Sequence, residues 1–384
     1  MSPLFKDARR ATIVTIFALT GLITGTFFSR LAELQLAIGL TEGQLGVALI
    51  GLSTGVFAGS LLVSQAIERH GIRRTLLWGL PLFAAGPLLA ALLADGAPSL
   101  FLLLVLFGVG LAVSNIAMNV EADRIEASHG HRLLNRCHAL WGVGFLAASA
   151  AGTAMVAAGI PPLWHFVGLF ILIAGATVAF VRPMQPVAPR AHRGNGARRR
   201  FARPTVAILL IMGFAISGMW LEGTMRNWSI IYLRDVFEPA EWVATLTLPS
   251  IVAFQIIGRL SADTLIDRYG PVRFARVLTA ITFIGLLLVV TSDSIAVTLV
   301  GFALIGLGIS TAHPQAMSAA ARLGDRPSSE NVAALSTLQT VLGLISPPMI
   351  GAVASAYGIH AAFVLLLPLP IIAIYFARYL QRSG

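Results

Sequence analysis

Glu222 and Arg226 are the two residues whose types and spacing most directly suggest chemistry. They are four residues apart with the acid first, and this order favours pairing of the two side chains on one face of a helix. A carboxyl in an apolar segment can take up and release a proton, while a guanidinium beside it can stabilise the charged form or hold an anionic group. The alternative is a structural ion pair. We expect Glu222 to take up and release protons, and Arg226 to be its ion-pair partner.

Other polar side chains in apolar segments are candidates for binding a small solute. Asn115 and Asn119 are four residues apart and so share a helix face. His313 is followed by Pro314, which has no backbone N–H and leaves a carbonyl one turn earlier without its helical donor. Packing between helices is the alternative for these residues, and anchoring at the membrane interface is the alternative for the tryptophans. The candidate binding residues are Asn115, Asn119, His138, Trp141, Gln255, His313 and Gln339.

Residue counts exclude several classes of enzyme. The one lysine, Lys6, lies in the N-terminal tail, which excludes a Gly-Lys-Ser/Thr phosphate loop and a buried Schiff-base lysine. The one cysteine, Cys137, excludes a disulfide framework and a cysteine-rich metal site. We expect neither a zinc-protease helix nor the nucleophile turn of a serine hydrolase. The chain is therefore expected to be no enzyme and to need no cofactor or metal.

The composition is that of a membrane protein. Hydrophobic residues make up 57% of the 384 residues and charged residues only 11%, against roughly 25% charged residues in soluble domains. About 20 apolar residues cross a bilayer as a helix. The chain predicts twelve such spans, near 11–32, 43–66, 75–94, 99–121, 137–159, 163–182, 205–233, 242–266, 273–292, 295–318, 330–356 and 361–380.

The basic residues predict the orientation of these spans. Placing both termini in the cytoplasm puts 23 of the 27 Lys and Arg residues on that side, as the positive-inside rule requires. The net charge of +10 therefore indicates a lipid bilayer as partner and not a nucleic acid. The stretch 183–203 is rich in proline and arginine and is expected to be a cytoplasmic linker between two six-helix bundles, residues 1–182 and 204–384.

Short sequence repeats support this division. Phe17–Gly21 recurs as Phe214–Gly218, and Gly108-Val-Gly110 recurs as Gly306-Leu-Gly308. The loop after the second span recurs after the eighth: Glu68-Arg69-His70-Gly71-Ile72-Arg73-Arg74 corresponds to Asp267-Arg268-Tyr269-Gly270-Pro271-Val272-Arg273. The offsets are nearly constant, so the halves form a parallel repeat. In each copy the glycine permits a tight turn and the arginines hold the loop at the anionic leaflet.

This loop resembles the signature of the major facilitator superfamily, and the likeness covers essentially the whole chain. The stretches Gly110–Asn119, Asn135–Gly142 and Glu222–Ser229 resemble the fucose-permease-like branch. Asn115 stands where that branch has an acid implicated in proton coupling. The resemblance implies an all-α integral membrane protein with twelve transmembrane helices in two parallel-repeat bundles. It also implies cytoplasmic charged contacts that close the inner side. The expected gating residues are Glu68, Arg69, Gly71, Arg73, Arg259, Asp263, Asp267, Arg268 and Gly270.

The functional expectation is a secondary transporter in the bacterial inner membrane. It would take up a small polar solute, sugar-like or another organic metabolite, together with protons, and act as a monomer. Span five has no proline, whereas drug antiporters of the superfamily tend to carry a Gly-Pro-rich signature there, so efflux is the second interpretation. A non-transporting receptor is the alternative of another class. Arg259 and Asp263, four residues apart near the inner end of span eight, are expected to pair as a structural or gating lock.

Overall fold

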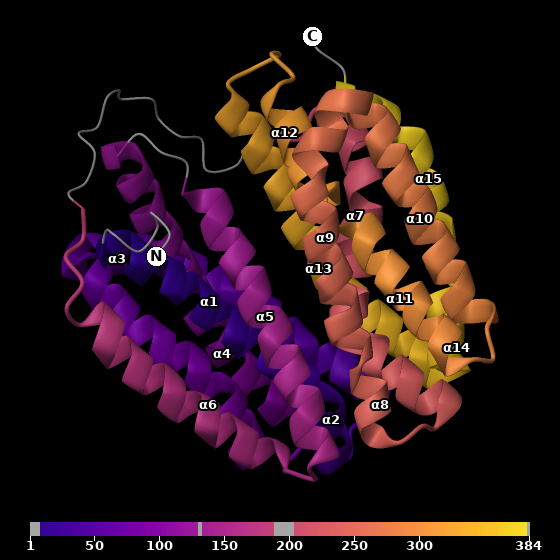
Figure 1. The fold of residues 1–384 in the computed structure, drawn as a ribbon, viewed down its shortest axis with the longest axis horizontal. Coiled ribbons are helices and arrows are strands. Elements are labelled where there is room, and N and C mark those ends of the chain that lie inside the picture. Colours follow the sequence, from indigo (N-terminus) through magenta and orange to yellow (C-terminus); the bar gives the residue numbers. More distant parts are fainter. Residues whose placement is uncertain (1–7, 130–132, 188–202, 382–384) are drawn as a thin grey trace. The chain divides into compact units, whose positions relative to one another are not determined.

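The computed structural model describes residues 8–129, 133–187 and 203–381, and no strand occurs within these ranges. The chain divides into two compact units, Met1–Gly194 and Asn195–Gly384 (Figure 1). The division falls inside the expected linker 183–203, of which residues 188–202 lie outside the described part. Each unit is a bundle of apolar helices, which confirms the all-α membrane fold.

The first unit is built from the six expected spans. Its elements are α1 (Ala8–Ser29), α2 (Leu31–Ile38), α3 (Glu42–Leu93), α4 (Ala97–His129), α5 (Leu134–Ala157), α6 (Pro162–Ala176) and the short π-helix η2 (Thr177–Val181). The closest packing is between α3 and α4 and between α1 and α5.

One helix, α3, contains two spans. A straight helix of its 52 residues would be about 78 Å long at 1.5 Å per residue, more than twice the roughly 30 Å of a bilayer core. The helix is broken at Gly71, whose φ of 76° and ψ of 159° are not helical. Among the described residues eleven helical segments are long and apolar enough to cross a membrane. Counting the two arms of α3 separately gives the twelve predicted spans.

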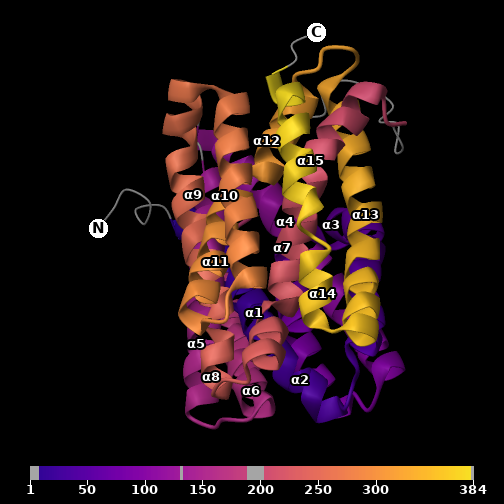
Figure 2. The ribbon, with the colours of Figure 1, turned by 90° about the vertical axis from the view of Figure 1, so that its right-hand side faces the viewer.

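The second unit contains the other six spans, three of them interrupted. Its elements are α7 (Val206–Phe237), α8 (Glu241–Thr245), α9 (Thr247–Tyr269), α10 (Pro271–Thr291), α11 (Ile295–Ile309), α12 (Ala312–Ala321), α13 (Ser328–Tyr357), α14 (Ile359–Val364), α15 (Pro368–Phe376) and the 3-10 turn η3 (Ala377–Gln381). The helices α9, α10 and α11 lie side by side, and α7 contacts α12, α13 and α15 (Figures 1 and 2).

The repeat predicted from the sequence is also present in the backbone. Gly270 joins α9 to α10 with φ 78° and ψ 154°, nearly the angles of Gly71. These angles lie in a region that is essentially restricted to glycine. A Cβ atom on Gly108 would clash with the carbonyl oxygen of Leu52, and one on Gly306 would clash with that of Ile251, 199 positions after Leu52. The two units thus share turn geometry and the same close helix approach.

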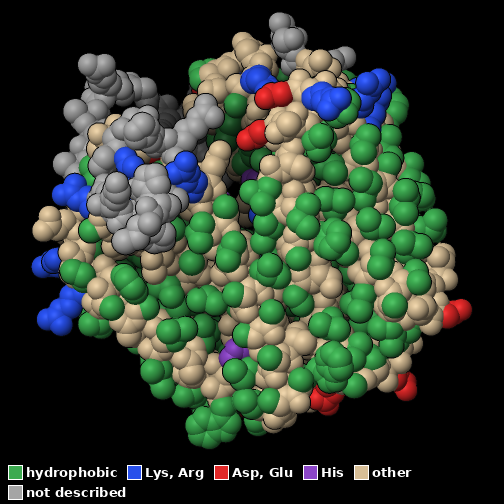
Figure 3. All heavy atoms as spheres, viewed as in Figure 1, with side chains coloured by type: hydrophobic (Ala, Val, Ile, Leu, Met, Phe, Trp, Pro, Cys, Tyr) green, Lys and Arg blue, Asp and Glu red, His purple; other side chains and the backbone are tan. Residues whose placement is uncertain are grey.

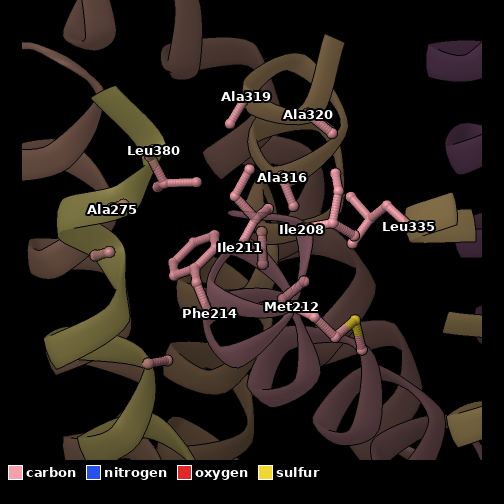
Figure 4. Close-up of a cluster of buried hydrophobic side chains, with 14 of the residues drawn as sticks. Ile208, Ile211, Met212, Phe214, Ala275, Ala316, Ala319, Ala320, Leu335 and Leu380 are labelled. Atoms are coloured by element: carbon pink, nitrogen blue, oxygen red, sulfur yellow. The ribbon is translucent and has the colours of Figure 1, made fainter. Parts of the chain in front are cut away.

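The core of the second unit lies where α7 meets α12, α13, α10 and η3 (Figure 4). The small side chains of α12 allow α7 to approach closely, and larger residues of α7 fill the space. The labelled members are Ile208, Ile211, Met212, Phe214, Ala275, Ala316, Ala319, Ala320, Leu335 and Leu380. This packing fixes the face of α7 on which the polar residues of the next section stand.

The outer flanks of the helices are apolar. Large hydrophobic side chains are strongly exposed, among them Trp78 at 79%, Leu260 at 73% and Val206 at 73%. Hydrophobic atoms cover the flanks seen in Figure 3, while Lys and Arg side chains gather toward one end of each unit's helices. Such a surface suits lipid and not water.

Candidate functional site

The carboxylate of Glu222 is the centre of a polar cluster within the second unit. Its Oε1 accepts hydrogen bonds from Arg226 Nη2 at 3.1 Å and from Gln255 Nε2 at 3.2 Å. Arg259 Nη2 lies 3.8 Å from the same oxygen. Glu222 and Arg226 expose 27% and 32% of their side chains, whereas Gln255 is buried. The expected Glu222–Arg226 pair therefore forms, and Gln255 and Arg259 join it from α9.

The break between α11 and α12 supplies a further member of this cluster. Pro314 has no N–H to donate to the carbonyl of Ser310, four residues earlier. The helix is interrupted at this point, because α11 ends at Ile309 and α12 begins at Ala312. Arg259 Nε donates to Ser310 O at 3.1 Å. The prediction of a carbonyl released by Pro314 is confirmed, and its partner is an arginine.

His313 lies at the same break and is exposed. It is close enough to Glu222 for an electrostatic interaction with the carboxylate. The cluster thus contains groups from α7, α9 and α12. Its titratable and charged members are Glu222, Arg226, Arg259 and His313.

The expected pair of Arg259 with Asp263 was wrong. The guanidinium of Arg259 contacts Ser310 and Glu222, while Asp263 is exposed and forms no ion pair with any described residue. Two physical reasons account for the difference. The order basic-before-acidic is the weaker one for a helical i,i+4 pair, and an exposed aspartate is satisfied by solvent. The ion pair expected here is therefore not formed, and a gating role for the two residues stays a prediction.

The candidates of the first unit lie on α4 and α5. Asn119 Nδ2 donates to the backbone carbonyl of Asn115 at 2.8 Å and to its Oδ1 at 3.2 Å. The two amides share a helix face as predicted, and both are half-buried. His138 is exposed and meets Phe17 edge-on, with ring centroids 5.2 Å apart. Trp141 is half-buried against Phe145.

Gln339 forms no hydrogen bond with the Glu222 cluster. It is buried on α13, at 8% exposure, and its Nε2 makes no hydrogen bond with any described residue. Trp220 of α7 donates its Nε1 hydrogen to Leu342 O at 3.1 Å, which ties α7 to α13. The indole of Trp220 therefore serves the packing of these two helices.

The charged loop residues are exposed at the helix ends. Glu68, Arg69 and Arg73 are exposed around Gly71, and Asp267 and Arg268 are exposed before Gly270. The guanidinium of Arg268 lies over the Tyr269 ring, 5.3 Å from its centroid. The glycine turns are confirmed by their positive φ angles. The gating role of the charges stays a prediction.

In the C-terminal third of α4, Glu121 and Arg124 hold the first residues of the expected linker. Glu121 Oε1 accepts the Val187 N–H at 2.8 Å, and Arg124 Nη1 donates to Val187 O at 3.4 Å. Glu121 is buried. These contacts support a structural role for both residues.

Two features were missed at the level of the sequence. Arg30 is fully buried at the break between α1 and α2, paired with Glu33 Oε2 at 2.7 Å and bonded to the Ile160 carbonyl; its only signal was an acid three residues later. Gly51-Leu-Ser-Thr-Gly55 matches the letters Gly-x-Ser-x-Gly. This stretch lies inside α3 and not on the strand-to-helix turn that a hydrolase nucleophile requires.

Comparison with known proteins identifies the family. The model of the Major Facilitator Superfamily matches residues 13–347. The chain belongs to this superfamily. Superfamily members are transporters and not enzymes, so the chain is a multi-pass membrane transporter of the permease kind. Members bind small-molecule substrates and typically act as monomers.

Individual relatives of the chain agree with this assignment. The chain is 27% identical to the uncharacterized transporter y4wD of Sinorhizobium fredii over 349 residues, covering 90% of this chain and 91% of the relative. It is similar in fold to the nucleoside transporter NupG, with a TM-score of 0.73, 14% identity and coverage of 97% and 99%. It is also similar to the fucose:proton symporter FucP of E. coli, with a TM-score of 0.65, 17% identity and coverage of 97% and 98%.

Proposed function

We propose that this chain is a secondary active transporter that takes up a small polar solute together with protons. It works in the bacterial inner membrane with both termini in the cytoplasm, because that orientation places most of its basic residues inside. Alternating access moves the solute, and the chain has no phosphate loop that would use ATP. FucP, a proton symporter by its name, supports the proposal as a protein of the same fold.

The observation that carries the proposal is the position of Glu222. A carboxylate within a membrane span is costly and usually serves a function. Glu222 stands in the middle of α7, bonded to Arg226 and Gln255, yet 27% of its side chain is accessible. A proton can therefore reach it, and the neighbouring cations oppose its uptake while the solute is absent.

Coupling requires that solute and proton affect each other's binding. If protonated Glu222 and bound solute favour the same state of the transporter, each increases the affinity for the other by the same factor. Arg226 and Arg259 compete with the proton for the carboxylate, and His313 adds to this effect when it is charged. The remaining candidates Asn115, Asn119, His138, Trp141, His313 and Gln339 are proposed to contact the solute. The exposed charges around Gly71 and Gly270 are proposed to close the inner side.

The test is proton-driven uptake by the full chain in liposomes. Vesicles with an inside-alkaline pH gradient are given labelled L-fucose, D-xylose, uridine and L-lactate, each without and with a protonophore. We expect accumulation of at least one probe by the wild type and collapse with the protonophore. Glu222→Gln should abolish accumulation but retain exchange of probe between the two sides.

The matched control is Glu241→Gln, at an exposed acid in the first turn of α8. It removes the same charge from the same unit and should accumulate the probe as the wild type does. Gradient-driven accumulation by Glu222→Gln at the wild-type level would overturn the assignment of the coupling acid. Loss of probe from preloaded vesicles under the same gradient, without uptake, would favour efflux.

A further inference from the structure

Arg259 is a cation whose contacts leave most of its hydrogen-bonding capacity unused. It lies near the middle of α9, which runs from Thr247 to Tyr269. Its Nε is bonded to Ser310 O, and its nearest carboxylate oxygen is 3.8 Å away on Glu222, too far for a hydrogen bond. Neither terminal nitrogen makes a hydrogen bond with a described residue, and 39% of the side chain is exposed.

Glu222 lies within ion-pair distance of this charge but forms no hydrogen bond with it. The carboxylate is hydrogen-bonded to Arg226, its partner in the favourable i,i+4 order, and to Gln255. Asp263, one turn after Arg259, is exposed and forms no pair with it. Arg226 and Glu222 together carry no net charge, so Arg259 adds one positive charge to the cluster. A charged side chain within a membrane span is expensive unless it serves a site.

The geometry of the guanidinium indicates what the site takes. With Nε held by Ser310, the two terminal nitrogens remain at the free end of a planar fork. This end matches the two oxygens of a carboxylate, which it binds with two parallel hydrogen bonds. One uncompensated charge suits a monoanion better than a phosphate dianion. Gln255, one turn before Arg259, holds the carboxylate of Glu222 beside this position.

We propose that Arg259 binds the carboxylate of the transported solute, which is a small organic monoanion and not a neutral sugar. This inference rests on the proposed transport function and names its substrate class. The bound anion lies beside Glu222, and two neighbouring carboxylates disfavour each other's charge. Binding therefore goes together with protonation of Glu222. One proton and one monoanion then cross together, and the transport cycle moves no net charge.

The first experiment needs no variant. The melting temperature of the purified full chain is measured with L-lactate, pyruvate, benzoate and D-gluconate, and with lactamide, benzamide and L-fucose as neutral counterparts. We expect stabilisation by at least one carboxylate and none by its amide. Stabilisation by L-fucose or an amide with no effect of any carboxylate overturns the inference, and so does a failure of every carboxylate to stabilise.

The second experiment assigns the contact to Arg259. Loss of a bidentate hydrogen bond to a charged group should weaken carboxylate binding about 10- to 100-fold in Arg259→Gln. Arg259→Lys retains the charge without the fork and should lose less. Arg322→Gln, at an exposed arginine after α12, is the matched control and should bind as the wild type does. Unchanged carboxylate affinity in a folded Arg259→Gln protein overturns the inference.

Failure of this inference can be told from failure of the proposed function. If proton-driven uptake of a neutral probe depends on Glu222 but not on Arg259, the symporter proposal is supported and the anion site is refuted. If carboxylate binding depends on Arg259 but uptake does not respond to the pH gradient, the anion site is supported and proton coupling is refuted. Uptake of a monocarboxylate that generates no membrane potential would agree with both.

Discussion

Replacing Gly71 or Gly270 by alanine tests whether the two loops need glycine for the backbone alone. Gly71 has φ 76° and ψ 159°, and Gly270 has φ 78° and ψ 154°. Apart from adjacent parts of the chain, no atom lies within 4 Å of the position that a Cβ would take at either residue. A steric clash with a neighbouring residue therefore adds nothing to the free-energy cost of the alanine substitution. The whole cost is that of a side chain in this backbone region, about 1–3 kcal/mol for each glycine.

This cost can be read from thermal unfolding. About 1 kcal/mol shifts the melting temperature by roughly 2–4 °C in proteins of 150–250 residues, the size range of each unit. Gly71→Ala and Gly270→Ala should each lower the melting temperature of the purified chain by about 2–12 °C. The residues lie in separate compact units, so the double variant should show the sum of both losses.

The control for this prediction is another glycine with open space around it. Gly343 lies inside α13, and a Cβ there also meets no atom within 4 Å, but its φ is not positive. Gly343→Ala should therefore stabilise the protein, by about 1 kcal/mol, because alanine is the better helix former. If Gly71→Ala were as stable as the wild type, the backbone argument would be refuted.

Two further substitutions address the Glu222 cluster. Asp263→Asn should change the free energy of unfolding by less than about 0.5 kcal/mol, because Asp263 is exposed and does not pair with Arg259. A loss of several degrees in melting temperature would show that the pair expected from the sequence does form. Pro314→Ala supplies a backbone N–H for Ser310 O, so it should leave stability unchanged or higher while it draws that carbonyl away from Arg259. Uptake of the probe should fall several-fold, and unchanged uptake would show that the Ser310–Arg259 bond is dispensable.

Features governed by local physics were predictable from the sequence. The spans follow from the length of the apolar segments, and the turns at Gly71 and Gly270 follow from the motif that contains them. The release of a carbonyl before Pro314 follows from the missing N–H of proline. The Glu222–Arg226 pair follows from helical spacing and residue order. Each of these features involves residues close together in the chain.

Features that depend on packing between helices were not predictable. The partner of Arg259 is set by the distance between α9 and the break before α12, and not by the acid four residues away. The bond of Gln255 to Glu222 was not predicted, because it depends on how α7 and α9 meet. The burial of Arg30 depends likewise on the Ile160 carbonyl, 130 positions along the chain. Single-sequence patterns carry no information on such distances.

The two halves share the close helix contact at Gly108 and Gly306 but not the charges of the Glu222 cluster. With the offset of the Phe17 repeat, Glu222 and Arg226 correspond to Gly25 and Ser29. With the offset of the glycine-turn loops, Arg259 corresponds to Ser60. A chain assembled from two copies of the first half would retain the steric framework and lose all three charges. The two halves therefore share their steric framework, whereas the three charges of the Glu222 cluster belong to the second half alone.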